Sequence, residues 1–560
     1  MSNLEALTGS LDISSDRRIN GLLNDVVGRL KEYAEAQREN INQLAQIGVM
    51  LSSAKDLNLL LETIVDQARS FTNCDGGTLY LRSEDEQSLE FKIVQTGSLN
   101  IRVGGRSAPI NWPPVPLFKD GQPNNNNVSA YVASKGEMVN IPDVYEVEGF
   151  NFDGTRKFDA ASGYRSKSML VVPMRDHENE IIGVLQLINA LDPTNGESIP
   201  FSPDFVIMSQ ALASQAAVAI TNTRLIRDLR NLFESFIQVI AAAIDEKSPY
   251  TGGHIMRVSN LTMEIANRLS EVPTGHYGET TFTADQLDEL RVAAWLHDTG
   301  KIVTPEHVVD KHTKLETIFD RRELVRMRFE LAIANTRISL AKVEGALDKT
   351  GHSQAELEVM RDELNARIKT IMDEYNFVIS CNKTQEFVPD ETIQRLNDIA
   401  NRFLETTLGP EPMLTENELY NLSIRKGNLT KEERQIIENH AAVTIKMLEK
   451  LPFPKKMRNV PAYAGAHHEK LNGKGYPLRL KGDQIKLQAR IMALADIFEA
   501  LTARDRPYKE PKKMSECMKI LGFMVKDGEL DGDLVQFFID QKLHIEYAHK
   551  YLDPAQLDVQ

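Results

Sequence analysis

The sequence predicts a multidomain protein in which an α+β domain, an antiparallel sheet with flanking helices, is joined by a long helix to an all-α helical bundle. Three observations lead to this prediction. The chain has 560 residues, a length typical of roughly two to four domains. Strand-like runs separated by turns occupy the N-terminal part, and the segments around the C-terminal histidines have helical periodicity.

The composition excludes several classes of protein. The chain has 65 basic and 80 acidic residues, a formal net charge of −15, which argues against a non-specific DNA binder or a binder of anionic membranes. Cys74, Cys381 and Cys517 lie far apart, which excludes a disulfide scaffold and fits a reducing compartment. No apolar run approaches the roughly 20 residues that span a bilayer, and the N-terminus lacks the pattern of a signal peptide. We therefore expect a soluble, cytoplasmic protein.

The first 50 residues predict a helix, because apolar residues recur at spacings of three and four. Such a stripe fits either an amphipathic helix that packs on its own domain or a coiled coil in a dimer, and the sequence leaves both open. The members of the stripe, with one polar residue among them, are Ile19, Leu22, Val26, Leu30, Tyr33, Gln37, Ile41, Leu44 and Leu51.

An α+β pattern of the kind found in sensory domains follows this helix. A predicted helix at 57–71 precedes strand-like runs that are separated by turns rich in Gly, Asn and Pro. Helices before and after a set of antiparallel strands are typical of the α+β class. The predicted strands are 77–81, 89–94, 169–173 and 181–188.

Two segments of this region resemble the second half of a GAF domain. They are Gly163-Tyr-Arg-Ser-Lys-Ser-Met-Leu-Val-Val-Pro-Met174 and Ile182-Gly-Val-Leu-Gln-Leu-Ile-Asn189, and the resemblance covers 51–225. GAF domains that bind cyclic nucleotides carry an Asn-Lys, Phe and Asp-Glu signature. This chain has Asn189, Phe201 and Asp204 at matching places, but Ala190 replaces the lysine and no glutamate follows the aspartate. The resemblance implies a regulatory domain with an unknown small ligand, or one that only dimerises and couples.

A connecting helix or coiled coil is predicted at 205–247, because neither proline nor glycine occurs from Asp204 to Ser248. Its apolar residues keep the spacing of a coiled-coil seam, which favours a homodimer through this helix. A shared helix can pass a shift or rotation between domains, and the alternative is a passive spacer. The seam residues are Val218, Leu225, Leu229, Leu232, Phe236, Ile240 and Ala243.

Five histidines and two aspartates in the C-terminal half form an ordered set that indicates a metal centre. Helices that direct His and Asp side chains into one bundle core are a common way to build a two-metal site. Neighbouring positions on a helix differ by about 100°, so an adjacent pair can address two ions. Two divalent ions can then activate water and clamp a phosphodiester. The set consists of His254, His297, Asp298, His440, His467, His468 and Asp496.

Two longer motifs resemble the HD-GYP family of the HD phosphohydrolases. One is His467-His-Glu-Lys-Leu-Asn-Gly-Lys-Gly-Tyr-Pro477, and the other is Ala495-Asp-Ile-Phe-Glu-Ala-Leu-Thr-Ala-Arg-Asp-Arg-Pro-Tyr-Lys509. The resemblance covers 228–552 apart from an insertion. It implies a metal-dependent phosphodiesterase that hydrolyses cyclic di-GMP, with iron or manganese favoured over zinc.

The resemblance also implies a role for each residue. One ion would be held by His254, His297, Asp298 and Asp496, and Asp298 would bridge to a second ion held by His440, His467 and His468. Lys301 would approach the scissile phosphate, and the loop Gly475-Tyr476-Pro477 would contact the ligand. Arg506 and Lys509 would grip phosphate or guanine. They belong to a basic cluster that offsets the acidic chain locally: Lys301, Lys470, Lys474, Arg504, Arg506, Lys509, Lys512 and Lys513.

Two positions depart from the family pattern. Tyr250 stands where some members carry a glutamate that holds a third metal, which favours a two-metal site and linear pGpG as the main product, with cleavage to GMP left open. Asn472 stands where an aspartate is usual. The loss of that one negative charge should be tolerated.

An insertion separates the family motifs at 313–427. Two apolar stripes predict a helical hairpin, and a third helix is expected at 391–404. The insertion is expected to be a lid, a dimer contact, a partner platform or a passive elaboration. The first stripe is Leu324, Met327, Leu331, Ala334, Ile338 and Ala341, and the second is Leu357, Met360, Leu364, Ile368 and Ile371.

Three other functions remain open from the sequence. One is the same chemistry on another cyclic dinucleotide such as cyclic GMP-AMP. Another is a scaffold that senses a cyclic dinucleotide without hydrolysing it, although the complete ligand set argues against this. The third is a general HD nucleotidase, against which the Gly475-Tyr476-Pro477 loop argues.

Overall fold

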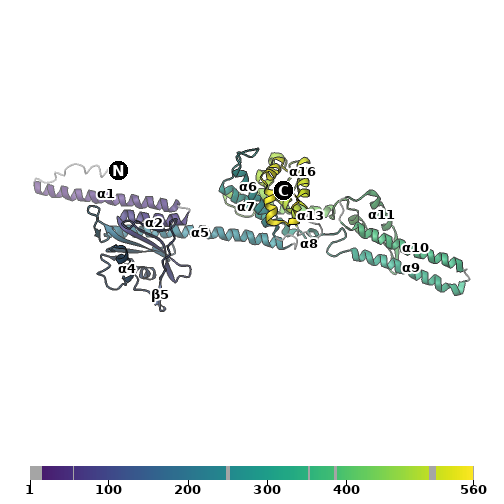
Figure 1. The fold of residues 1–560 in the computed structure, drawn as a ribbon, viewed down its shortest axis with the longest axis horizontal. Coiled ribbons are helices and arrows are strands. Elements are labelled where there is room, and N and C mark those ends of the chain that lie inside the picture. The colour runs from purple at the N-terminus through teal and green to yellow at the C-terminus, as the bar shows by residue number, and fades with distance from the viewer. Residues whose placement is uncertain are drawn as a thin grey trace. The chain divides into compact units, whose positions relative to one another are not determined.

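The computed structural model describes residues 16–53, 56–247, 253–350, 354–383, 387–503 and 512–558. The chain divides into two compact units, Met1–Leu232 and Phe233–Gln560. The division falls inside one continuous helix, α5 (Pro203–Lys247). We describe each unit by itself, and the labels follow Figure 1.

The N-terminal unit is built on an antiparallel sheet with the strand order β3-β2-β1-β9-β8-β7. Strand β4 pairs with β2, β10 pairs with β9, and β5 and β6 form a separate hairpin. The strands are β1 (Cys74–Arg82), β2 (Ser88–Thr96), β3 (Ile101–Gly104), β4 (Val115–Pro116), β5 (Phe118–Lys119), β6 (Gln122–Pro123), β7 (Val139–Ile141), β8 (Met169–Arg175), β9 (Ile181–Leu191) and β10 (Ser198–Ile199). The four strands predicted from the sequence are β1, β2, β8 and β9, and the shorter strands were not predicted.

Helices cover both faces of this sheet. On one face, α1 (Arg17–Ser53), α2 (Leu57–Thr72) and the first part of α5 bury apolar side chains such as Ile47, Ile64 and Leu212. On the other face, α3 (Val128–Lys135) and the segment around α4 (Asp153–Ser162) build a second core. The side chains of each strand enter the two cores in turn, because successive side chains of a strand point to opposite faces.

The apolar stripes predicted on α1 and α5 lie mostly outside these cores. Among the described side chains of α1, the buried apolar ones are Ile47 and Leu51, near its C-terminal end. Ile19 and Leu30 are exposed. On α5 the exposed apolar residues are Leu225, Leu229, Leu232, Phe236 and Ile240. Both helices therefore present an uncovered apolar seam.

Apart from the insertion, the C-terminal unit is an all-α bundle with one main core. Its helices are the end of α5, α6 (His254–Glu271), α7 (Ala284–Leu296), α8 (Glu306–Val309), α13 (Lys431–Leu448), α14 (Val460–Gly465), α15 (Leu487–Thr502), α16 (Met514–Lys526), α17 (Gly532–Asp540) and α18 (Leu543–Tyr551), with 3₁₀ turns η2 (Thr299–Val303), η3 (Lys455–Met457), η4 (Gly482–Gln484) and η5 (Pro554–Gln556). Thr283 and Thr430 start α7 and α13 with capping boxes, which satisfy free N–H groups of the first turn. These caps fix where the helices that carry His297 and His440 begin.

The insertion forms a helical hairpin of α9 (Arg322–Thr350) and α10 (Gln354–Cys381) with its own core. The stripe named on α9 is not its buried face: Leu324 and Met327 are 45% and 61% exposed, while Val325 and Phe329 are buried. The helix has apolar residues on two faces, and the sequence does not say which face meets α10.

The third helix of the insertion is shorter than predicted. Helix α11 (Asp390–Ala400) ends before a two-stranded hairpin of β11 (Phe403–Thr406) and β12 (Gly409–Pro412), and α12 (Glu416–Leu422) follows. The predicted helical end at 404 is therefore wrong, because Phe403 to Thr406 pair with a second strand.

Candidate metal centre

Two groups of side chains, all buried except the partly exposed His468, face each other inside the C-terminal bundle. His254, His297 and Asp298 form one group, and His440, His467 and His468 form the other. Within each group the candidate ligand atoms lie within 4.8 Å of one another. The residues come from α6, the end of α7, α13 and the end of α14, so chain segments far apart in the sequence meet here.

Asp298 lies between the two groups and turns one carboxylate oxygen to each. Its Oδ2 atom is 3.3 Å from Nε2 of His297 and 3.6 Å from Nε2 of His254. Its Oδ1 atom is 3.4 Å from Nε2 of His440 and 3.9 Å from Nε2 of His467. A carboxylate in this position can bridge two ions.

Asp496 on α15 completes the arrangement. Its Oδ1 atom lies 3.3 Å from Nε2 of His254, and its Oδ2 atom lies 3.8 Å from Nδ1 of His468. The structure thus brings all seven predicted metal-binding residues together.

Three of the rings are oriented by backbone carbonyls. Nδ1 of His297 is 2.7 Å from the carbonyl of Ala294, and Nδ1 of His440 is 2.5 Å from that of Ile437. His467 repeats the pattern with the carbonyl of Ala464, at 2.5 Å. Because a carbonyl can only accept a hydrogen bond, each Nδ1 carries the proton and each neutral ring presents its Nε2 lone pair.

The atoms that face the centre lack other partners. Nε2 of His297, His440 and His467, together with Oδ1 of Asp298, are buried without a hydrogen-bond partner among the described residues. Buried polar atoms are nearly always satisfied, so such a set needs an explanation. Imidazole nitrogens and a carboxylate converging on one space fit divalent first-row metal ions.

The protonation states favour ligation on the His440 side. Burial lowers the pKa of His440, and it lowers that of His467 well below the ordinary value. Burial also lowers the pKa of His468, to about 4. These rings are therefore neutral near pH 7, as metal ligation requires.

On the other side, carboxylates and imidazoles stabilise each other's charged forms. Burial alone would raise the pKa of Asp298, but Lys301 and His297 outweigh it and hold the pKa well below its usual range. Burial would lower the pKa of His254 and His297, but Asp298 and the other acids raise both. An ion that binds here must displace protons from these rings.

Glu499 is a site residue that the sequence did not reveal. Its buried carboxylate contacts Nδ1 of His254 through one oxygen, and the other oxygen accepts a hydrogen bond from Nε of Arg257 at 2.8 Å. A second carboxylate of this kind orients a ligand imidazole. Glu499 lies three residues after Asp496 on α15, in an otherwise apolar run, and that position was the available signal.

Gly300 allows the turn that carries Asp298 to approach α13. A Cβ atom at this position would lie 2.0 Å from the carbonyl oxygen of His440 and 2.7 Å from the amide nitrogen of Thr444. In the gap, Gly300 N–H donates to the Thr444 hydroxyl at 2.9 Å, and that hydroxyl lies 3.1 Å from the carbonyl of His297. Close packing of these backbones sets the distance between the two halves of the site.

The Gly475-Tyr476-Pro477 loop lies next to the second group of histidines. The Tyr476 ring centroid is 4.8 Å from that of His468 and 6.3 Å from that of His440. Glu469 braces the loop, because its carboxylate accepts hydrogen bonds from the amides of Leu478 and Leu480 at 2.6 and 2.9 Å. Between this loop and α13 lies a pocket lined by Gln435, Glu438, Asn439, Ala442, Gly473, Lys474, Gly475, Tyr476, Pro477 and Arg479.

The predicted basic cluster is only partly assembled at the site. Lys301 Nζ lies 2.6 Å from Asp298 Oδ2, and Lys474 lines the pocket beside the loop. Lys470 pairs instead with Glu529 at 2.8 Å, and Lys512 approaches Glu516. Tyr250, Arg504, Arg506 and Lys509 lie outside the described residues.

Comparison with protein families identifies both units. Residues 56–220 match the GAF domain, and residues 251–377 and 416–534 match two models that are each described as an HD domain. The chain carries a GAF domain followed by an HD domain. All seven candidate metal-binding residues lie within these two matched segments.

Several curated proteins resemble parts of this chain. A probable cyclic di-GMP phosphodiesterase of Vibrio cholerae is 37% identical over 139 residues, which are 24% of this chain and 31% of that protein. The 3'3'-cGAMP-specific phosphodiesterase 3 of the same organism is 42% identical over 98 residues, 17% of this chain and 20% of that protein. A cyclic di-GMP phosphodiesterase of Thermotoga maritima is 35% identical over 96 residues, 17% of this chain and 26% of that protein. The chain thus spans less than a third of the length of each.

Solved structures resemble the GAF domain. The GAF domain of an Acinetobacter phosphoenolpyruvate-protein phosphotransferase is 17% identical, with a TM-score of 0.25, and the match covers 34% of this chain and 98% of that one. The GAF domain of the Coxiella burnetii protein of the same kind is 15% identical, also with a TM-score of 0.25, covering 34% of this chain and 96% of that one.

Asn189 of the GAF domain has a structural role. Its side-chain oxygen accepts the Lys167 amide at 2.7 Å, and its amide nitrogen donates to the Arg165 carbonyl at 2.8 Å and to the Tyr164 hydroxyl at 3.0 Å. Asn189 also adopts a positive φ of 56°, which asparagine tolerates. This residue therefore braces the segment before β8.

One described helix, α5, is long and apolar enough to cross a membrane by length and composition. Of its most apolar window, 44% is buried inside the structure. Core helices of soluble proteins meet the same criterion, and the first part of α5 contributes buried residues such as Leu212 and Ile220 to the GAF-domain core.

Proposed function

We propose that this protein is a metal-dependent phosphodiesterase that hydrolyses cyclic di-GMP to linear pGpG, with a GAF domain as its regulatory part. The observation that carries this proposal is the position of Asp298, whose two carboxylate oxygens face different groups of buried imidazoles. Two divalent ions that share one carboxylate could activate water and clamp a phosphodiester for hydrolysis. Relatives named as cyclic di-GMP phosphodiesterases support the substrate.

The proposed ligand sets follow the two groups of side chains. One ion would be held by His254, His297, Asp298 and Asp496, and the other by Asp298, His440, His467 and His468. We propose iron or manganese, to which imidazole and carboxylate ligands are suited. When bound, such ions supply a water nucleophile at neutral pH and neutralise charge on the phosphodiester.

The proposed hydrolysis consumes the cyclic dinucleotide and one water molecule. The oxygen of water bonds to phosphorus, the bond from phosphorus to the 3'-oxygen breaks, and that oxygen leaves as a hydroxyl after it gains a proton. One turnover opens the ring and gives a linear dinucleotide with a 5'-phosphate. Hydrolysis of its remaining diester would give GMP, and Tyr250 in place of a third-metal glutamate favours pGpG as the main product.

The protein's own side chains bind and orient the substrate in this proposal. Lys301 lies beside Asp298 and offers an ammonium to the scissile phosphate. Gly475, Tyr476 and Pro477 contact the nucleotide, and Tyr476 stays neutral because burial raises its pKa. We further propose that Arg506 and Lys509 grip phosphate or guanine, since arginine offers a bidentate fork.

A second candidate is the same reaction on cyclic GMP-AMP. It is favoured by the 42% identity to a phosphodiesterase named as specific for 3'3'-cGAMP. The two candidates differ in one base only, so measured kcat/KM values on both dinucleotides distinguish them.

The regulatory part of the proposal concerns the first unit and its helix. We propose a GAF domain at 51–225 with a small ligand, a connecting helix at 205–247 and a catalytic domain at 228–552 that contains the insertion at 313–427. The exposed seam of α5 favours a homodimer, because a seam at heptad spacing is covered when two copies pair. We also propose that the protein is soluble and cytoplasmic and binds neither DNA nor membranes.

The decisive experiment combines metal analysis with product identification. Protein purified without oxygen should contain about two divalent ions per chain and convert cyclic di-GMP to pGpG. Asp298→Asn should lose metal and turnover while the helical content stays, and Asp285→Asn, at an exposed pair with Lys456, should change neither. Full turnover in Asp298→Asn would refute the assignment. Metal without hydrolysis of any cyclic dinucleotide would instead support a sensing scaffold.

A further inference from the structure

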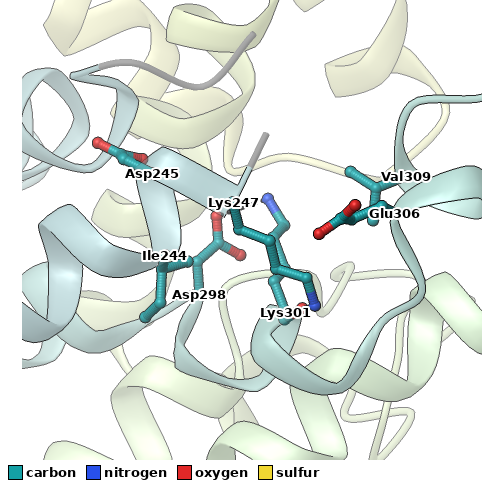
Figure 2. Close-up of a pocket in the computed structure, with 7 residues that line it drawn as sticks. All are labelled: Ile244, Asp245, Lys247, Asp298, Lys301, Glu306 and Val309. Carbon is teal, nitrogen blue, oxygen red and sulfur yellow. Dashed lines mark hydrogen bonds and ion pairs between the residues drawn. The ribbon is translucent and has the colours of Figure 1, made fainter. Parts of the chain in front are cut away.

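The last turn of α5 ends in a lysine that contacts three backbone carbonyls beside the metal centre. Nζ of Lys247 lies 2.9 Å from the carbonyl oxygen of Lys301, 2.5 Å from that of Ile302 and 2.6 Å from that of Thr304. Figure 2 shows Lys247 next to Lys301 and Asp298 in the pocket that these residues line. An ammonium has three N–H donors, and here each finds an acceptor.

These carbonyls belong to the end of the turn that carries the site residues. The 3₁₀ turn η2 starts directly after Asp298, contains Lys301 and ends at Val303. The Lys301 carbonyl also accepts the Thr304 amide at 3.0 Å, and the carbonyls at the end of a helical turn attract positive charge. Lys247 therefore donates hydrogen bonds to the end of the turn that begins directly after Asp298.

A second charge in the same turn of α5 meets the helix that carries His254. The carboxylate of Asp245 accepts a hydrogen bond from the Gly253 amide at 3.1 Å, and the Ile255 amide also contributes to this contact. Helix α6 begins at His254, so a negative charge lies at its N-terminus, where the helix dipole favours it. Each charge thus matches the helix end that it contacts.

Packing fixes this turn of α5 between the two contacts. Ala241 and Ile244 are buried with Ile255 of α6, and Trp295 of α7 packs against them. Residues two positions apart on a helix do not share a face. Asp245 and Lys247 therefore reach different neighbours from one rigid turn.

We propose that Asp245 and Lys247 are positioning residues through which the end of α5 sets the spacing between His254 and the Asp298–Lys301 turn. Helix α5 is continuous from Pro203 to Lys247. A shift or rotation of its last turn would therefore act on both halves of one metal site. The activity part of the test rests on the proposed function, and the structural part does not.

The test uses the full-length protein with its metal. Lys247→Met removes the three donors and keeps the length of the side chain, while Lys247→Arg keeps positive charge and several donors. Lys456→Met is the matched control, because Lys456 makes one exposed pair with Asp285. Hydrogen–deuterium exchange reports the amides of Lys301 and Thr304, which are hydrogen-bonded within the turn.

We expect Lys247→Met to speed exchange in peptides covering 298–304 at least fivefold, with metal content and exchange in α13 unchanged. Turnover should fall at least tenfold while KM stays within twofold, because the substrate contacts remain. Lys247→Arg should recover part of both effects, and Lys456→Met should match the wild type. Asp245→Asn should speed exchange at the start of α6 instead.

Two results overturn the proposal. Unchanged exchange in Lys247→Met means that the ammonium does not hold the turn, whatever the activity. Loss of metal with faster exchange throughout the domain means that Lys247 only supports the fold. If the wild type hydrolyses no cyclic dinucleotide but Lys247→Met still loosens 298–304 alone, the proposed function fails and the positioning role stands.

Discussion

The buried carboxylate of Glu499 is hydrogen-bonded to Nδ1 of His254, the ring atom that faces away from the metal centre. His254 differs in this from His297, His440 and His467, whose Nδ1 atoms contact backbone carbonyls. Arg257 binds the other oxygen of Glu499 and keeps its charge balanced. The orientation of one ligand thus depends on a side chain.

Glu499→Gln should weaken metal binding about 10- to 100-fold, because an amide orients and polarises the imidazole less than a carboxylate does. Competition with a chelator measures this affinity. Glu264→Gln is the control, since Glu264 lies on the surface of α6 near Lys550. Equal affinity in the two variants would show that Glu499 does not support His254.

Gly300→Ala should destabilise the HD domain by about 1–3 kcal/mol, the usual cost of overpacking. The added methyl would meet the His440 carbonyl, so the Asp298 turn and α13 must separate. Gly522→Ala on α16 is the control, because nothing lies within 4 Å of its Cβ position and alanine favours a helix. Unfolding by urea, followed by Trp295 fluorescence in a Trp112→Phe background, measures both. A neutral Gly300→Ala would contradict the close approach.

The metal-free protein should lose stability on acidification between pH 6.5 and about 4. His468 has a pKa near 4 when folded and near 6.5 when unfolded, so the unfolded chain binds more protons in this window. The full shift corresponds to roughly 3 kcal/mol, but the side chain is 24% exposed, and solvent screening reduces the effect to about 1–2 kcal/mol. His468→Gln should flatten the dependence, measured with chelator by the same Trp295 assay. An equal slope in both proteins would contradict the assignment.

The exposed seam of α5 should hold two copies together. Leu229→Glu combined with Leu232→Glu places charges in the seam and should convert a dimer to a monomer in sedimentation experiments. Asn231→Glu adds a charge at a neighbouring exposed position and should leave the dimer intact. A monomeric wild type at micromolar concentration would contradict the homodimer.

The convergence of the seven candidate metal-binding residues could be predicted because histidine is informative in a chain with only 12 of them. Their helical flanks and the adjacent pairs at 297–298 and 467–468 carried enough information to place them in one core. Glu499 was missed because its position three residues after Asp496 does not by itself distinguish a buried carboxylate from an exposed one. Lys247 was missed for a related reason: its partners are carbonyls, which leave no trace in a sequence.

Packing faces were predicted less well than helices. Helix α9 has apolar residues both at Leu324 and Met327 and at Val325 and Phe329, so periodicity alone cannot choose the buried face. The predicted helix at 391–404 extended into the first two residues of β11, because the strands of this hairpin have only four residues each. Short strands that pair with each other have too few positions to show an alternating pattern.

The carbonyl contacts of His297, His440 and His467 have a consequence for how this centre can be tuned. Each ring is held by the backbone carbonyl of the residue three positions earlier, and every amino acid supplies such a carbonyl. Substitutions around these rings therefore leave the orientation of the imidazoles unchanged. Adjusting the preference for one metal over another must then work through side chains that contact a ligand, such as Glu499, which Arg257 holds in turn. Directed variation of that pair is the shortest route to a centre with altered metal selectivity.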